Sequence, residues 1–566
     1  MKISPECKKQ FMYKNRMNFW FTISMVFIDS GVAICIAFII KSITEAMETT
    51  DFGKLRQAIL LTAIATAANF FVGFMQKKYR NRYLKKALLQ FKMFIFEKLL
   101  KKSINEFGNT TTGTFISAFS NDLVSVETHY LAGNIGLVTN ISLLVGGIVA
   151  MAYINWILML CVVAASILPC AISLKYGTKI TAREKQTSIR NAGFVEQIKD
   201  LLNGFIVIKS FKAENEALQI FESENISVEE AKRKRRETND TVSILGDISF
   251  IVITVLIVAV GTFFVFKSVM TIGGVIAFVE LSSTVLNPIK RLVPLWSNRK
   301  SAIAIINRIA DFVEIEHEAE EKAMISEFND SIVVKNVKFE YETGKTVLNT
   351  INQTFEKGKS YAIVGNSGGG KSTLLSLLMG HFSTYEGNIL FDDKELRDIS
   401  LDSLYDIVSV IQQNVFLFDS SIKNNITMFK DFPEEKYNAA VKNAGLSDLI
   451  EKKGNDYACG SSGCNLSGGE KQRVSIARCL IRETPVLLMD EATASLDNAT
   501  ATEVTNSILN IDGLTRIIVT HKLEESTMEK YDEIIVVNNG DIVERGGYTE
   551  LMGMKKYFYS LFNVLQ

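Results

Sequence analysis

The sequence lacks an excess of either charge. Its 566 residues include 62 basic and 62 acidic side chains, which gives a formal net charge of zero. A protein that attracts nucleic acid through its overall charge is strongly basic. We therefore expect no nucleic acid among the partners of this chain.

The sequence also lacks a cysteine pattern that would bind a metal ion or cross-link a small domain. Its 7 cysteines include no CxxC motif and no Cys/His ligand spacing, and several lie in apolar stretches. We expect them to be unpaired thiols. The first residues lack a short apolar segment followed by a small-residue cleavage site, so we expect no signal peptide. The cysteines are Cys7, Cys35, Cys161, Cys170, Cys459, Cys464 and Cys479.

Long apolar runs are abundant before residue 300, and hydrophobic residues make up 47% of the chain. Each run approaches the ~20 residues that cross the hydrocarbon core of a bilayer. Burial in a soluble helical core is the alternative, but stretches such as 248–266 are apolar all round and carry no charge. We predict six transmembrane helices, at about 17–43, 55–76, 130–154, 157–178, 243–266 and 272–296.

Basic residues predict the orientation of these spans. Clusters at 77–86 and 232–236 follow the second span and precede the fifth. By the positive-inside rule, both termini and the C-terminal half are cytosolic. We expect a multi-pass protein of a cell membrane, most simply a bacterial plasma membrane, with the lipid bilayer as a partner. The run at 232–236 could also be a nucleic-acid patch, but we favour a solvated helix face near anionic lipid.

The stretch GNSGGGKST, at 365–373, lies between the apolar run 361–364 and the helix-forming run 374–379. Glycines let backbone amides approach a phosphate, and the following helix points its positive end at the same anion. Lys371 would reach the β- and γ-phosphates, and Ser372 would hold Mg²⁺. The stretch predicts a nucleoside triphosphate site rather than a chance turn, formed by Gly365, Asn366, Ser367, Gly368, Gly369, Gly370, Lys371, Ser372 and Thr373.

A second stretch, LSGGEKQR at 466–473, precedes the apolar strand VLLMDE at 486–491. In form and order these resemble the signature and Walker B strand of the ABC ATPase family. Each further motif is weak alone, but their joint order supports the resemblance. They are Tyr341 (adenine-stacking aromatic), Gln413 (Q-loop), Ser495 to Asp497 (D-loop) and His521 (switch histidine).

The resemblance implies a role for each residue in ATP hydrolysis with ATP and Mg²⁺ as cofactors. Phosphoryl transfer needs charge neutralisation and an oriented water. Lys371 and the metal ligands Ser372, Gln413 and Asp490 would neutralise charge. Glu491 would polarise the attacking water, and His521 would contact the γ-phosphate. Lys371, Gln413, Glu491 and His521 are therefore the expected catalytic residues.

The resemblance also implies a dimer, because the signature closes the ATP site of the other subunit. Ser467, Gly468, Gly469, Glu470 and Asp497 would then bind nucleotide across the interface. Every ATP-site motif carries the residues needed for hydrolysis, whereas one half of a heterodimer often has a degenerate site. We therefore favour a homodimer and keep a heterodimer as the alternative. Family-like coupling loops lie near 103–127 and 196–214.

Two departures from the family pattern stand near the signature. Glu470 replaces the more usual glutamine, and GSSG at 460–463 replaces the common Gly-Glu-Arg-Gly. The second change puts communication through that loop in doubt, whereas both carboxylates and the histidine needed for hydrolysis are present.

We therefore predict a polytopic α-helical membrane domain (1–300, six transmembrane helices with long cytosolic extensions), a linker (301–330) and an α/β P-loop ABC ATPase domain (331–566). The predicted function is an ATP-driven exporter half-transporter of a small molecule, lipid or peptide. An importer on the same fold is the second hypothesis, and an ATP-gated channel or regulator is the third.

Carboxylates inside the spans suggest a substrate cavity. Asp29 lies near the middle of the first span, where a lipid-facing charge is costly. Glu280, Thr284, Asn287 and Arg291 form one stripe of the sixth helix. A structural role is the alternative, such as a pairing of Glu280 with Lys267. Otherwise Asp29, Glu280, Thr284 and Asn287 would favour a cationic substrate.

Overall fold

The computed structural model describes residues 3–102, 104, 107, 112–314, 322–341, 344, 346–493 and 495–565. The chain divides into two compact units, which are described separately. A helical unit contains residues 1–102 and 110–315, and an α/β unit contains residues 103–109 and 316–566. Most of the acidic run in the predicted linker, 315–321, lies outside the described residues.

The helical unit is built from helices much longer than a bilayer is thick. α3, α8 and α10 contain 49, 48 and 53 residues, whereas ~20 residues cross the hydrocarbon core. Among the described residues, six helical segments are long and apolar enough to span a membrane. The predicted membrane domain with long helical extensions is confirmed. Its elements are α1 (Pro5–Met12), α2 (Arg16–Glu48), α3 (Phe52–Leu100), α5 (Thr112–Ser117), η1 (Ala118–Asp122), α6 (Leu123–Ser125), η2 (Val126–Leu131), α7 (Ala132–Ile154), α8 (Trp156–Asn203), α9 (Phe205–Ser210), α10 (Glu214–Phe266) and α11 (Ile272–Val313).

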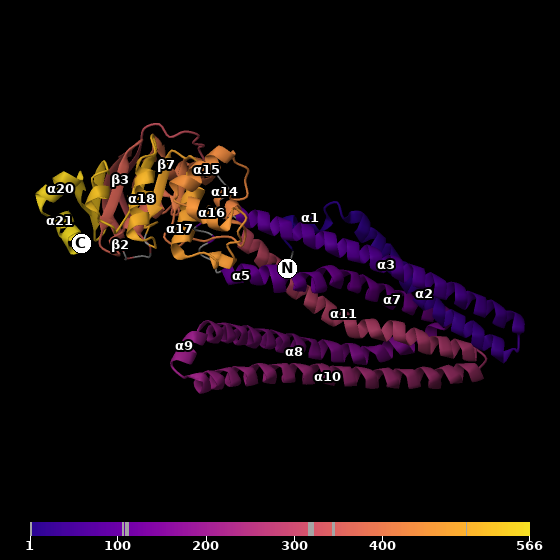
Figure 1. Ribbon diagram of the computed structural model, residues 1–566. Coiled ribbons are helices and arrows are strands. Elements are labelled where there is room, and N and C mark those ends of the chain that lie inside the picture. The colour runs from indigo at the N-terminus through magenta and orange to yellow at the C-terminus, as the bar shows by residue number, and fades with distance from the viewer. Residues whose placement is uncertain are drawn as a thin grey trace. The chain divides into compact units, whose positions relative to one another are not determined.

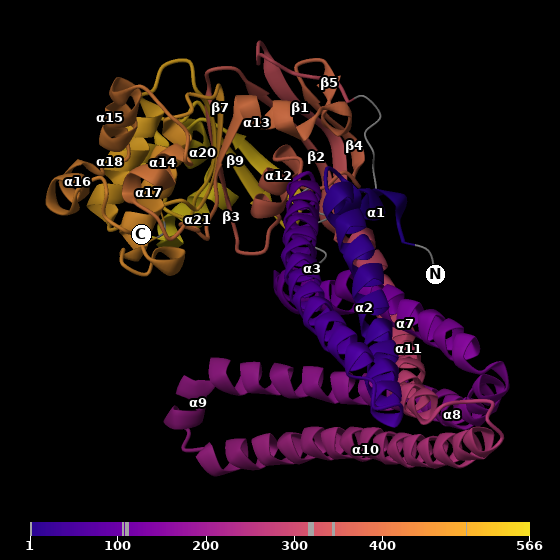
Figure 2. The ribbon, with the colours of Figure 1, turned by 90° about the vertical axis from the view of Figure 1, so that its right-hand side faces the viewer.

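The long helices pack side by side in pairs. α2 lies along α3, α7 along α11, and α8 along α10. Both views show α8 and α10 as one hairpin closed by α9 (Figure 1, Figure 2). Side-chain caps start two of the helices: Asp51 accepts hydrogen bonds from the first turn of α3, and Asn155 from that of α8. The caps satisfy amides that have no partner within the helix.

Two hydrophobic clusters hold the helical unit together. One gathers α1, α3, η2 and α11 around Phe11 and Phe91, whose ring centroids are 4.7 Å apart. The other joins α7, α8, α10 and α11 around the fully buried Met151, Ile257 and Phe278. α11 contributes to both clusters and so links the two ends of the helical unit.

The α/β unit contains two sheets. The six-stranded sheet has the order β10-β9-β3-β8-β7-β6, and all its strands are parallel except β10 at one edge. The second sheet is antiparallel, in the order β2-β1-β4-β5. The predicted α/β architecture is confirmed. The strands are β1 (Ser331–Glu340), β2 (Thr346–Glu356), β3 (Ser360–Gly365), β4 (Glu386–Phe391), β5 (Lys394–Glu395), β6 (Val408–Ile411), β7 (Val486–Asp490), β8 (Thr515–Val519), β9 (Glu533–Asn538) and β10 (Asp541–Gly546).

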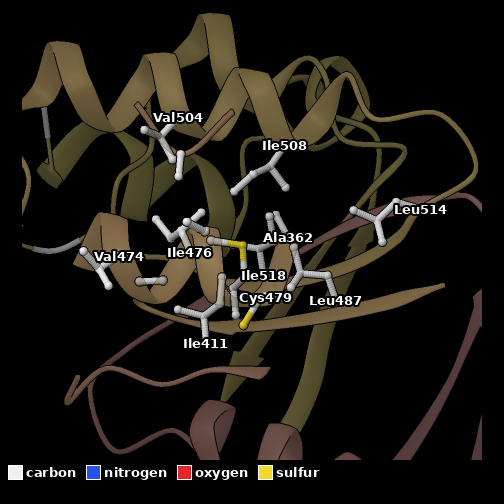
Figure 3. Close-up of a cluster of buried hydrophobic side chains, with 14 of the residues drawn as sticks. Ala362, Ile411, Val474, Ile476, Cys479, Leu487, Val504, Ile508, Leu514 and Ile518 are labelled. Carbon is white, nitrogen blue, oxygen red and sulfur yellow. The ribbon is translucent and has the colours of Figure 1, made fainter. Parts of the chain in front are cut away.

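Helices and hydrophobic side chains cover both faces of the six-stranded sheet. Successive strand residues point to opposite faces, so Leu487 belongs to one cluster and Leu488 to the other. Figure 3 shows the cluster of Leu487, where strand and helix side chains meet. The helical elements are α12 (Lys371–Leu378), η3 (Leu396–Asp398), α13 (Leu401–Ile407), α14 (Ile422–Thr427), α15 (Glu434–Asn443), α16 (Ser447–Lys453), η4 (Ser461–Gly463), α17 (Gly468–Leu480), α18 (Asn498–Leu509), α19 (Glu525–Met528), α20 (Tyr548–Met554) and α21 (Tyr557–Leu565).

Candidate functional site

Four neighbouring parallel strands end at one edge of the six-stranded sheet, and the loops after them carry the predicted site residues. β3 leads into the glycine-rich loop, β6 precedes Gln413, β7 precedes Glu491 and β8 precedes His521. The order β3-β8-β7-β6 makes these strands neighbours. Because the carboxyl ends of parallel strands form one crevice, the topology gathers residues that are far apart in the sequence.

Two glycines in the loop after β3 are required by the backbone. Gly365 has φ 146°, and a Cβ there would lie 1.9 Å from the carbonyl oxygen of Val537. Gly370 has φ 101°, and a Cβ there would lie 2.7 Å from a side-chain carbon of Leu348. The loop closes internally, since the amide of Gly369 donates to the carbonyl of Asn366 at 3.1 Å. This compact loop leads directly into α12, whose first amides point toward an anion bound there.

Lys371 and Ser372 begin α12 and lie beside the end of β7. Lys371 Nζ donates to the carbonyl oxygens of Gly365 and Asn366 at 2.9 and 2.8 Å, and Ser372 Oγ donates to Asp490 Oδ1 at 3.0 Å. Burial lowers the pKa of Lys371 and raises the pKa of Asp490. Burial disfavours the charged form of each residue, and the nearby charge of opposite sign stabilises it. A hydroxyl beside a carboxylate fits Mg²⁺, which prefers oxygen ligands and keeps phosphate and water oxygens as well.

Glu491 lies at the centre of the site. One carboxylate oxygen accepts a hydrogen bond from Gln413 Nε2, and the other lies 2.9 Å from His521 Nε2. Its backbone has φ 49°, a conformation that non-glycine residues rarely adopt and that is often kept at functional sites. The amide of Glu491 donates to the carbonyl of Val519, which ties the turn to β8.

A cavity of about 930 Å³ opens over these residues. Tyr341, which is 52% exposed, borders it and exchanges a hydrogen bond with Thr373 Oγ1. The rings of Phe339 and Phe382 meet Tyr341 edge-on and fix its position. Ten predicted nucleotide-binding or catalytic residues and Val347 line the cavity, namely Tyr341, Ser367, Gly368, Gly370, Lys371, Ser372, Thr373, Gln413, Glu491 and His521.

The signature residues lie away from this cavity, at the start of α17. The Ser467 side chain accepts a hydrogen bond from the amide of Glu470, and the Glu470 carboxylate accepts one from the amide of Ser467. This capping box gives the unusual Glu470 a local role. Gly468 and Gly469 form the first positions of α17, and Asp497 caps α18 by accepting from the amide of Thr500. Among the described lining residues of the cavity, none comes from this group.

Lys453 is a residue that the sequence analysis missed. Its Nζ lies 3.5 Å from a carboxylate oxygen of Glu470 and 4.8 Å from the ring centroid of Tyr457. The pKa of Glu470 is lowered, with the Ser467 amide and Lys453 opposing the effect of burial. The two residues come from different helices, α16 and α17, and no spacing in the sequence connects them.

The predicted substrate residues lie on α2 and α11 of the helical unit. α11 is the most buried of the six candidate spans, at 56% of its apolar window. Its exposed positions nevertheless include the polar Glu280, Asn287 and Arg291, while Asp29 on α2 and Thr284 on α11 are half-buried. A mostly buried helix thus presents a polar stripe outward.

Glu280 and Thr284 differ in their contacts, although both lie on α11. Among the described residues Glu280 forms no ion pair, and Lys267 lies over the ring of Phe263 instead. Thr284 packs tightly against α7, because a Cβ on Gly147 would lie 2.5 Å from its Oγ1. The sequence analysis missed the ion pair of Asp247 and Lys290, which joins α10 to α11 at 2.9 Å.

Both parts of the chain match known families. The family model described as ABC transporter matches residues 348–494, and that described as ABC transporter transmembrane region matches residues 19–289. The "ATP-dependent lipid A-core flippase" of Desulfotalea psychrophila is 30% identical over 488 residues, which cover 84% of each chain. The "Putative multidrug export ATP-binding/permease protein YgaD" of Bacillus subtilis is 29% identical over 492 residues, covering 85% of this chain and 84% of that protein.

A further relative and a solved structure agree with these matches. The "Uncharacterized ABC transporter ATP-binding protein YwjA" of Bacillus subtilis is 31% identical over 473 residues, covering 81% of this chain and 80% of that protein. A bacterial Atm1-family ABC exporter with ATP bound has the same fold, with a TM-score of 0.86, 22% identity, and coverage of 97% of this chain and 99% of that chain. The importer hypothesis is not favoured. The chain belongs to the ABC transporter family, as an exporter-type half-transporter that couples ATP hydrolysis to transport.

Proposed function

We propose that two copies of this chain form the working exporter, and that each ATP site takes its phosphate loop from one copy and its signature from the other. One observation carries this proposal: the cavity beside Lys371, Gln413, Glu491 and His521 receives no signature residue from its own chain among the described residues. The capped start of α17 at Ser467 supplies amides that suit a γ-phosphate. A site built from one chain alone would lack them.

The α8–α10 hairpin supports the same assembly. Within the helical unit, α8 and α10 pack along each other and meet the other helices mainly through α11 and α7. The short helix α9 at the tip carries exposed apolar side chains at Phe205, Ile206 and Val207. Apolar side chains grouped in this way suit a protein partner, and we infer that the tip acts as a coupling loop.

In the proposed mechanism Lys371 and the loop amides would hold the phosphates, while Ser372, Asp490 and Gln413 would hold Mg²⁺. The metal would offset negative charge on the β- and γ-phosphates. Glu491 accepts a proton from the attacking water, and His521 orients the γ-phosphate and that water. The pair of Gln413 and Glu491, 2.9 Å apart, already holds the carboxylate toward the cavity.

The ATPase unit and both termini would lie in the cytosol, where ATP is available. The basic clusters at 77–86 and 232–236 support this orientation. For the substrate we propose an amphipathic molecule with a cationic group, bound near Glu280. The polar stripe on the otherwise buried α11 supports a solvated cavity, and the relatives named above include proteins named for lipid A-core and for multidrug export.

Mixed dimers provide the test of the shared ATP site. Lys371→Ala disables the phosphate loop and Ser467→Arg the signature, so each variant alone should fail to hydrolyse ATP. Co-expression places both defects in one site and leaves the other site of a mixed dimer intact. We expect ATPase activity and ATP occlusion to return in affinity-purified mixed dimers. If both stay absent in mixed dimers that still assemble, each site belongs to a single chain and the proposal is wrong.

A further inference from the structure

A groove of about 400 Å³ lies between the first turns of α2 and the middle of α3. Asn18 of α2 lines one side, and Arg82, Lys85, Lys86 and Leu89 of α3 line the other. The α3 residues have the spacing i, i+3, i+4 and i+7, which places them on one helix face. Three cations therefore face one small depression.

These cations have no acidic partner in the described residues. None of Arg82, Lys85 and Lys86 forms an ion pair, and no Asp or Glu occurs within 77–96 on α3 or 16–28 on α2. Lys86 Nζ donates to the carbonyl oxygen of Lys14 at 2.7 Å. Like charges one turn apart repel each other. An anion bound in the groove would relieve this repulsion.

The wall of the groove is held in place by the bend between α1 and α2. The buried Asn15 donates to the carbonyl of Tyr83 on α3 at 3.0 Å and accepts a hydrogen bond from Asn18. The contact of Phe11 with Phe91 anchors the preceding helix to α3. The groove is thus formed by helices that are packed against each other.

The aromatic side chains beside the groove are of the kind that gathers at a membrane–water interface. Trp20, two residues after Asn18, is 61% exposed. Phe21 of α2 stacks on Tyr79 of α3 with ring centroids 4.8 Å apart. Trp and Tyr gather where hydrocarbon meets headgroups, and both helices are apolar on the far side of this level.

We propose that this groove binds the headgroup of an anionic phospholipid. The phosphate would meet Arg82 and Lys85, while Lys86 and Asn18 border it. The acyl chains would extend along the exposed apolar face of α3, where Phe71 is 60% exposed and lies eleven residues, or three turns, before Arg82. Basic pockets between helices at the cytosolic leaflet suit anionic lipid. The inference uses the proposed cytosolic placement of this end of α2 and α3.

Binding of phosphatidylglycerol to the full-length chain in neutral detergent tests the proposal, with bound lipids counted by native mass spectrometry. Arg82→Gln with Lys85→Gln should weaken phosphatidylglycerol binding by about tenfold or more and leave phosphatidylcholine binding unchanged. Lys77→Gln with Arg80→Gln removes the same charge from other faces of α3 and should bind like wild type. Equal binding by all three proteins, or an equal loss in both variants, would overturn the site.

Two further arms separate a lipid from a soluble anion and a binding defect from misfolding. Excess inorganic phosphate should not displace phosphatidylglycerol; displacement would identify a soluble-anion site instead. Leu89→Glu introduces an acid at an exposed position of the groove and should also weaken phosphatidylglycerol binding, with an unchanged melting temperature in lipid-free detergent. No arm involves ATP or transport, so failure here is distinct from failure of the proposed function.

Discussion

His521 Nε2 lies 2.9 Å from one carboxylate oxygen of Glu491, and Gln413 Nε2 lies 2.9 Å from the other. The three side chains follow three neighbouring strands, so the rigid sheet sets their separation. A carboxylate held from both sides keeps its orientation with little loss of entropy when substrate arrives. This arrangement leads to the first prediction.

Glu491→Gln should bind ATP and lower ATP turnover by about 100-fold or more, the usual contribution of a general base. The amide keeps the size of the side chain but cannot accept a proton from water. Nucleotide binding and steady-state hydrolysis of the purified variant measure the two effects separately. Asp490→Asn is the contrasting variant, since it should weaken ATP binding in the presence of Mg²⁺. Near-normal turnover in Glu491→Gln would remove Glu491 from its proposed role.

Local sequence predicts this site well because each part is a short strand–loop–helix unit. Gly365 and Gly370 are identifiable because no other residue fits their backbone. The short apolar runs of β3 and β7 are typical of buried strands, so their secondary structure is also readable from the sequence. Contacts between distant helices leave no such local trace. Lys453 meets Glu470 only because the fold brings the end of α16 to the start of α17, and Asp247 meets Lys290 across 43 positions. The contact of Thr284 on α11 with Gly147 on α7 was unpredictable for the same reason.

Lys453→Met should raise the KM for ATP up to about fivefold, the scale of a charge effect at a helix N-terminus. Without Lys453, no cation offsets the charge of the Glu470 carboxylate at the start of α17, where the proposed dimer brings the γ-phosphate of the partner's ATP. Glu470→Gln in the same chain should restore the KM. Lys452→Met removes a neighbouring exposed charge and serves as control. An unchanged KM, or no rescue, would refute the compensation.

Gly147→Ala should destabilise the helical unit by about 1–3 kcal/mol, the usual cost of overpacking. The added methyl would lie 2.5 Å from Thr284 Oγ1 and 3.0 Å from a methyl of Val285. Thermal unfolding in detergent measures the loss, and Thr284→Ala in the same chain should recover most of it. Gly31→Ala is the matched control, since a Cβ there meets nothing within 4 Å. If both glycine variants melt alike, Thr284 has no packing role at this contact.

Glu280→Gln together with Asp29→Asn should abolish the stimulation of ATPase activity by cationic amphiphiles while keeping basal activity. Glu280 is exposed on α11 and forms no ion pair among the described residues, so its charge is available to a substrate. An unpaired carboxylate inside a membrane span is costly unless it faces a solvated cavity, and a cation there would recover part of that cost. We expect neutral amphiphiles to stimulate the variant as they do wild type. Glu48→Gln removes one carboxylate charge at the exposed end of α2 and should leave every response intact. Unchanged stimulation by cations, or a collapse of expression in the double variant but not in Glu48→Gln, would show that the two carboxylates serve helix packing instead.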